Sequence, residues 1–148
     1  MIAAERPDTP DAQALIAELE DHLASLYPNE SRHGYSVEEL LREEVAFFIL
    51  REDGMPAGCG GVQIYGTEYG ELKRMYVRPQ FRGRALGKMV LNHLTAYVKK
   101  HGVELLRLET GIYQKEAIGL YEGSGFQRIP PFGEYKEDPL SLFLEKRM

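Results

Sequence analysis

Hydrophobic residues near the start of the chain recur at the spacing of a helix. A turn of 3.6 residues puts five of them on one face: Leu15, Ile16, Leu19, Leu23 and Leu26. Thr9 followed by Pro10 has the form of an N-cap with proline at the first helical position, and Pro28 stops the pattern. The spacing therefore predicts an amphipathic helix from about residue 10 to 27. Ser36 and Glu39 then form a capping-box pattern, which predicts a second, short helix.

Three β-type segments follow, at residues 45–50, 57–65 and 71–77. Short turns at residues 52–54 and 66–70 join them, so we expect an antiparallel meander. The second segment contains Gly58, Gly60 and Gly61, which weaken a strand or mark a close approach of another backbone.

A long helix is predicted after Pro79, and its apolar face is formed by Leu86, Met89, Val90, Leu94 and Val98. Basic residues at 99–101 and Gly102 mark its end. We then expect a strand at 103–110, a helix at 115–123, and strands at 126–129 and 140–145, with a short strand at 2–6. The fold class is α/β: residues 1–148 form one domain with a mixed sheet and helices on both faces.

The composition excludes several functional classes. With 43% hydrophobic and 28% charged residues among 148, the chain is globular, and its net charge of −5 disfavours a nucleic-acid partner. No apolar run approaches the roughly 20 residues that span a bilayer, and the first residues do not read as a signal peptide, so we expect a cytoplasmic protein without a membrane partner. Cys59 is the single cysteine, and the histidines (His22, His33, His93 and His101) lack metal-ligand spacing, so no metal is expected.

The segment from Gln80 to Lys88 carries the most specific signal. A strand passes through a turn of small residues directly into the long helix, which aims unpaired backbone N–H groups at one spot. Small residues (Gly83, Ala85 and Gly87) let oxygens approach the backbone, and basic ones (Arg82, Arg84 and Lys88) add positive charge. Two phosphates fit such a turn. An ordinary strand-to-helix turn with solvated arginines is the plainer alternative.

Two nucleotide-binding patterns fit this segment poorly. Residues 83–88 read G-x-x-x-G-K, one residue short of a P-loop, and Met89 replaces its magnesium-binding hydroxyl. Ala85 stands where the dinucleotide pattern requires its second glycine. A magnesium-dependent ATP-binding domain is therefore disfavoured.

Two motifs together resemble the GNAT superfamily of N-acetyltransferases. Gln80-x-x-Gly83-x-Ala85 is similar to the Q/R-x-x-G-x-G/A signature, and residues 117–126 (AIGLYEGSGF) are similar to A-[IV]-x-L-Y-x-x-x-G-F at the expected distance. The order of elements matches from end to end, so the resemblance covers nearly the whole chain.

The resemblance implies acetyl-CoA as cosubstrate. The strand at 71–77 would splay away from the strand at 103–110 and leave an acyl-CoA cleft. The main chain of Met75, Tyr76 and Val77 would hold the pantetheine arm. The pyrophosphate would lie on amides of the turn: Arg82, Gly83, Arg84, Ala85, Leu86, Gly87 and Lys88. Gln114 replaces an asparagine common in the family and could still bond the CoA arm.

The same resemblance assigns catalytic roles. Tyr121 falls on the tyrosine that protonates the departing CoA thiolate, and this role is favoured over that of a core residue on the same helical face. An alkyl amine, with a pKa of about 10.4, must also lose a proton. Glu71 matches the base of histone-type members, and Glu109 is a rival. A non-catalytic acyl-CoA-binding or sensing module would not need Tyr121, so the enzyme is favoured.

The acceptor is expected to be a small-molecule amine that attacks acetyl-CoA directly in a ternary complex. Loops at 27–36 and 129–139 carry aromatic and acidic residues that suit a cationic amine. The plainer alternative is that these loops are acidic because the whole chain is acidic. Arg32 or Arg74 could instead bind an acceptor carboxylate. The sequence does not choose among a polyamine, an amino acid, an aminoglycoside-like drug and a protein lysine, and it leaves a homodimer open.

Overall fold

A single mixed sheet organises the chain, and the computed structural model describes all residues from 1 to 148. Its seven strands lie in the order β1-β2-β3-β4-β5-β7-β6. Their bounds are β1 Ile2–Ala4, β2 Ala46–Glu52, β3 Met55–Tyr65, β4 Tyr69–Val77, β5 Leu105–Gly111, β6 Gln127–Ile129 and β7 Ser141–Arg147. β2, β3 and β4 pair antiparallel in succession, which confirms the predicted meander.

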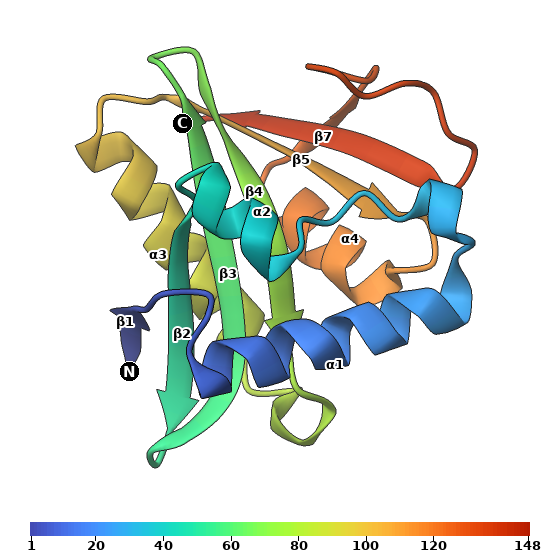
Figure 1. Cartoon of the computed structure of the whole chain (residues 1–148). Coiled ribbons are helices and arrows are strands. Elements are labelled where there is room, and N and C mark those ends of the chain that lie inside the picture. Colours follow the sequence, from blue (N-terminus) through green and yellow to red (C-terminus); the bar gives the residue numbers. More distant parts are fainter.

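Helices cover both faces of this sheet (Figure 1). α1 (Pro10–Leu26) and α2 (Val37–Arg42) pack on one face, and α3 (Leu86–Lys100) and α4 (Lys115–Gly123) pack on the other. Successive side chains of β2 point to opposite faces of the sheet, so β2 contributes to the core on both sides. Phe47 and Ile49 join the α1–α2 side, while Phe48 and Leu50 join the α3–α4 side. The α/β fold class is confirmed.

The helix starts form as their sequences predict. The Thr9 hydroxyl accepts a hydrogen bond from the Ala12 amide at 3.3 Å. At α2, the Glu39 amide donates to the Ser36 hydroxyl at 3.2 Å, and the Ser36 amide donates to the Glu39 carboxylate at 3.1 Å. These reciprocal bonds satisfy helix donors that would otherwise lack partners.

The hairpin between β3 and β4 is longer than predicted. The turn was expected to run to residue 70, but β4 already begins at Tyr69. The ring of Tyr65 stacks on that of Tyr69 with centroids 4.7 Å apart, and the Arg107 guanidinium lies 4.7 Å from the Tyr69 centroid. Cross-strand aromatic packing of this kind extends pairing to the end of a hairpin.

Strands β4 and β5 separate soon after they meet. They are parallel and pair only through Gly70 with Leu106 and Glu71 with Arg107. Beyond these pairs β4 continues to Val77 and β5 to Gly111 without a shared hydrogen-bonded register, and the two arrows diverge in Figure 1. The predicted splay of the central strands is therefore present.

A bulge in β4 lies beside this opening. Cys59 pairs with Tyr76 and Gly61 pairs with Lys73, so Arg74 and Met75 together face Gly60. Arg74 has a φ of 51°, a left-handed value that marks the extra residue of the bulge. The bulge allows neighbouring residues of β4 to face the same cavity.

A substitution at Leu94 tests how much the core on the α3 side contributes to stability. Leu94 is fully buried among β3, β4 and α3, so Leu94→Ala should destabilise the fold by about 2–5 kcal/mol through lost burial and a residual cavity. Met89→Ala is the matched control on the same helix, because the Met89 side chain is exposed and should cost less than about 0.5 kcal/mol. Urea unfolding of both variants gives the comparison. Equal destabilisation by the two would contradict this account of the core.

Candidate active site

Two cavities meet where β4 and β5 separate. The larger, of about 600 Å³, lies between the end of β4, the start of α3 and the start of α4. The smaller, of about 120 Å³, lies between α1, the segment after it, β4 and β5. Five residues line both cavities: Leu19, Met75, Gln114, Ala117 and Tyr121. A molecule in one cavity can therefore contact a molecule in the other.

The turn before α3 forms one end of the larger cavity. Ala85 is the N-cap of α3, with a left-handed φ of 59° and no side-chain cap. The amides of residues 83–88 donate no hydrogen bond within the chain. Gly83 has a φ of 83°, and no atom lies within 4 Å of the position that a Cβ would take. Unpaired amides at a helix N-terminus with open space beside them suit an anion.

The basic residues of this turn divide into two groups. Arg82 and Lys88 line the larger cavity, and Arg82 Nε donates to the Val77 carbonyl at 3.2 Å. Arg84 does not line it, because its guanidinium lies over the Phe81 ring, 5.5 Å from the centroid. Of the residues that the sequence placed at the phosphates, Gly83, Ala85, Leu86 and Gly87 also line the cavity.

The remaining predicted cosubstrate residues line the same cavity farther along. Met75, Tyr76 and Val77 contribute the end of β4, and Gln114 contributes the N-cap of α4. Because β4 has left β5 here, its edge faces the cavity rather than another strand. An extended chain could pair with such an edge.

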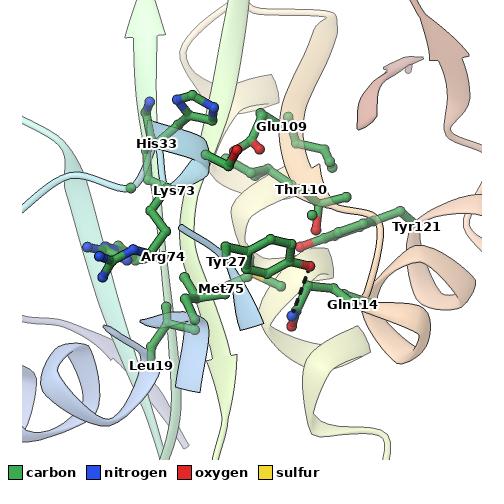
Figure 2. Close-up of a pocket in the computed structure, with 18 residues that line it drawn as sticks. Leu19, Tyr27, His33, Lys73, Arg74, Met75, Glu109, Thr110, Gln114 and Tyr121 are labelled. Atoms are coloured by element: carbon green, nitrogen blue, oxygen red, sulfur yellow. Dashed lines mark hydrogen bonds between the residues drawn. The ribbon is translucent and has the colours of Figure 1, made fainter. Parts of the chain in front are cut away.

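Tyr27 belongs to the loop that the sequence predicted beside the acceptor, and it lines the smaller cavity, but its hydrogen bonds were not predicted. Its hydroxyl accepts a hydrogen bond from the Tyr113 amide at 2.9 Å. It accepts a second from Gln114 Nε2 at 3.4 Å, which Figure 2 shows as a dashed line. Its ring lies against Gly111, where a Cβ would collide with it. Tyr27 therefore fixes the loop between β5 and α4. Gly111 at a strand end is the one sequence feature that hints at this close approach.

Tyr121 points into the junction of the two cavities from α4 (Figure 2). Only 5% of it is exposed, and its ring packs against Phe126 with centroids 5.7 Å apart. Its hydroxyl makes no hydrogen bond within the chain. Burial, with a smaller contribution from the charge of Glu109, raises the pKa of Tyr121. The hydroxyl is therefore protonated at neutral pH and available as a donor.

The two candidate bases occupy different environments. Glu71 lines neither cavity: its carboxylate accepts from Lys73 Nζ at 2.8 Å and from the Tyr135 hydroxyl at 2.6 Å, with the Glu71 side chain 4% exposed. Glu109 lines the smaller cavity and accepts from the Ser141 hydroxyl at 2.8 Å. Burial raises the pKa of the Glu109 carboxyl. The geometry thus favours Glu109 over Glu71 as a group that meets a ligand.

The comparison with known families agrees with this geometry. The sequence model of the Acetyltransferase (GNAT) family matches residues 12–126. The chain belongs to the GNAT family. The match runs from α1 to the end of α4 and contains the turn before α3, Gln114 and Tyr121.

Individual relatives of this GNAT chain cover nearly its whole length. An IAA acetyltransferase of Azospirillum brasilense is 42% identical over 147 residues, which are 98% of this chain and 95% of the relative. A Klebsiella pneumoniae crystal structure, assigned as an acyl-CoA N-acyltransferase, is 34% identical with a TM-score of 0.85 and covers 99% of this chain and 96% of its own. These relatives and the family match identify an acetyl-CoA-dependent N-acetyltransferase.

A more distant structure shares the fold. The PaiA N-acetyltransferase of Thermoplasma acidophilum, solved in complex with coenzyme A, is 22% identical with a TM-score of 0.76, over 100% of this chain and 99% of its own.

None of the helices is both long and apolar enough to cross a membrane. No group of three or more His, Cys, Asp or Glu side chains is arranged to hold a metal ion.

Gly83→Glu should abolish most acetyl-CoA binding, because a carboxylate would occupy the space beside the unpaired amides. Gly102→Glu is a matched control at the other end of α3, since Gly102 has a φ of 79° and equally open surroundings. Both variants carry the same backbone strain and charge change. Calorimetry should show a loss on the order of 10²-fold or more in acetyl-CoA affinity for Gly83→Glu alone. Similar affinities in the two variants would place the pyrophosphate elsewhere.

Proposed function

We propose that this enzyme acetylates a small-molecule amine by direct attack on acetyl-CoA in a ternary complex. The observation that carries the proposal is the position of Tyr121, whose unbonded hydroxyl stands where the two cavities join. The larger cavity suits CoA, because it combines the amide-rich turn with a free strand edge. The smaller cavity suits a compact acceptor. A metal ion has no part in this scheme.

The reaction needs two proton movements. The amine nitrogen bonds to the thioester carbon, and the carbon–sulfur bond then breaks. Tyr121 gives its proton to the departing thiolate, and solvent restores it. A sensing module that only bound acyl-CoA would have no use for this hydroxyl between two cavities.

Glu109 is our preferred base. It accepts the amine proton, directly or through a water, from the wall of the acceptor cavity. Its raised pKa brings the carboxylate closer to the pH at which it works. Glu71 does not line this cavity and instead forms an ion pair with Lys73, which does. Since the Azospirillum relative is named for IAA, an acceptor panel for this enzyme should include IAA beside amines.

Tyr121→Phe tests the acid. The change keeps the buried ring and removes one oxygen, so kcat should fall on the order of 10²-fold while the melting temperature and acetyl-CoA affinity stay close to wild type. The defect should shrink with an acyl donor whose thiol is more acidic, because a better leaving group needs less protonation. An unchanged kcat would exclude the acid role, and an equal defect with both donors would mean that Tyr121 acts by positioning.

Glu109→Gln and Glu71→Gln separate the two candidate bases. Only ionised Glu109 can take a proton, so wild-type activity should fall as the pH drops through its pKa, which lies above the ordinary glutamate value. Glu109→Gln should lower kcat on the order of 10²-fold, and its remaining rate should keep rising toward the pKa of the free amine, about 10.4.

Glu71→Gln should act on stability instead, because it leaves the buried Lys73 ammonium without its carboxylate. Its free energy of unfolding should fall by about 3–5 kcal/mol, with kcat per folded molecule retained. The pH–rate profile and the urea unfolding curve are measured for each of the two variants. A rate loss confined to Glu71→Gln would return the base role to Glu71.

A further inference from the structure

The smaller cavity, which we propose for the acceptor, is lined by more cationic than anionic side chains. Its charged lining residues are Arg32, Lys73, Arg74 and Glu109, and His33 also lines it. The loop carboxylates that suited a cationic acceptor in the sequence lie elsewhere, since Glu30, Glu134 and Glu137 are exposed and line neither cavity. An acceptor whose only charge is positive would meet this lining poorly.

Most of these cations already have close partners. Lys73 is paired with Glu71 at 2.8 Å. Arg74 donates to the Glu20 carboxylate at 2.6 Å and to the Tyr35 carbonyl at 2.7 Å. The Nε2 atom of His33 lies 3.2 Å from the Asp138 carboxylate. The charges of Lys73 and Arg74 are therefore balanced within the chain.

Arg32 is the exception. Its nearest carboxylate oxygen, on Glu20, is 3.5 Å from Nη1, and its bond from Nη2 to Asn29 is 3.3 Å long. The Nε atom is buried and has no hydrogen-bond partner, the only such side-chain atom in the chain. Arg74 lies 2.6 Å from the other oxygen of Glu20, so Arg32 forms the longer and weaker ion pair with that carboxylate. An unpaired donor of a charged group costs free energy, so Arg32 is the least satisfied cation of this cavity and has the most to gain from an acceptor oxygen.

We propose that the acceptor carries a carboxylate in addition to its amine, and that Arg32 binds this carboxylate through its guanidinium. The inference rests on the proposed acetyl transfer. A guanidinium edge offers two parallel N–H donors, which match the two oxygens of a carboxylate. Arg32 comes from the segment after α1 and Glu109 from β5, and both line the same cavity, so one small molecule can meet both (Figure 2 shows the Glu109 wall).

The size of the cavity limits the spacing of the two groups. Its volume of about 120 Å³ is a fifth of the 600 Å³ of the larger cavity, so it suits a compact molecule. The amine and the carboxylate must then be joined by a short spacer, as in an amino acid, with any larger part projecting outward. Polyamines and protein lysines lack this combination of groups.

The test compares matched acceptors. Wild-type enzyme with acetyl-CoA is offered the common amino acids, their carboxamides and their decarboxylated amines, and CoA release is recorded. At least one acid should be accepted, with kcat/KM about 10²-fold above its amide and its decarboxylated amine.

Two variants link this preference to Arg32. With the best acid, Arg32→Gln and Arg32→Lys should lower kcat/KM on the order of 10²-fold and 10-fold, chiefly through KM, while activity on the amide barely changes. Arg42→Gln is the matched control, because Arg42 is an exposed arginine on α2 and should behave as wild type. Arg32→Gln should also keep the unliganded melting temperature, because it removes an unsatisfied donor. A merely structural arginine would lower that temperature.

The outcomes separate this inference from the proposed function. An amide or amine accepted as well as its acid would overturn the carboxylate proposal and leave acetyl transfer intact. The same holds for an Arg32→Gln defect that is equal on acid and amide. Acceptance of no acid in the panel also overturns it. Failure of the wild type to bind acetyl-CoA in calorimetry would instead overturn the proposed function.

Discussion

The register between β4 and β5 ends after two residue pairs, and the site depends on that interruption. A sheet whose strands stayed paired to Val77 and Gly111 would have no space between them. Because the strands part, β4 keeps a free edge, α4 can set Tyr121 between them, and Tyr27 can reach the loop after β5. Each of these features comes from a different element, and each requires the same gap. The two cavities are thus consequences of one broken ladder.

A buried ion pair lies at the point where β4 and β5 separate, and it stabilises the sheet there. Glu71 belongs to the last shared residue pair, and its carboxylate is held by Lys73 and by the Tyr135 hydroxyl. The Lys73 ammonium also lies 3.9 Å from the Tyr35 ring centroid. A buried pair of this kind is tolerated only when its hydrogen bonds are satisfied, and here residues from three segments satisfy it. Burial raises the pKa of Glu109, whereas the nearby pair has opposing effects, because the Lys73 charge lowers this pKa and the Glu71 charge raises it less.

Local signals gave most of the fold in advance. The capping residues Thr9 and Ser36, the helical spacing in α1 and α3, and the glycine-rich turn all act within a few residues, so a single sequence contains them. Contacts between distant segments were less visible. Nothing near Tyr27 indicates that its hydroxyl binds an amide 86 positions away. Glu71 and Lys73 are two apart on a strand and so share a face, which could have suggested their pairing, but their burial could not be read from the sequence.

Charge placement explains how an acidic protein can hold two anionic groups. The chain has a net charge of −5, yet CoA phosphates and an acceptor carboxylate both need local positive potential. At the turn before α3, backbone amides supply much of that potential without adding formal charge. In the acceptor cavity, Glu20 is shared between Arg74 and Arg32, which holds one guanidinium firmly and leaves the other partly free. If Glu20 paired fully with Arg32, the Arg32 guanidinium would have less to gain from a ligand. An arginine that is poorly satisfied in the empty enzyme is therefore the arrangement that gives an acceptor carboxylate the most binding energy.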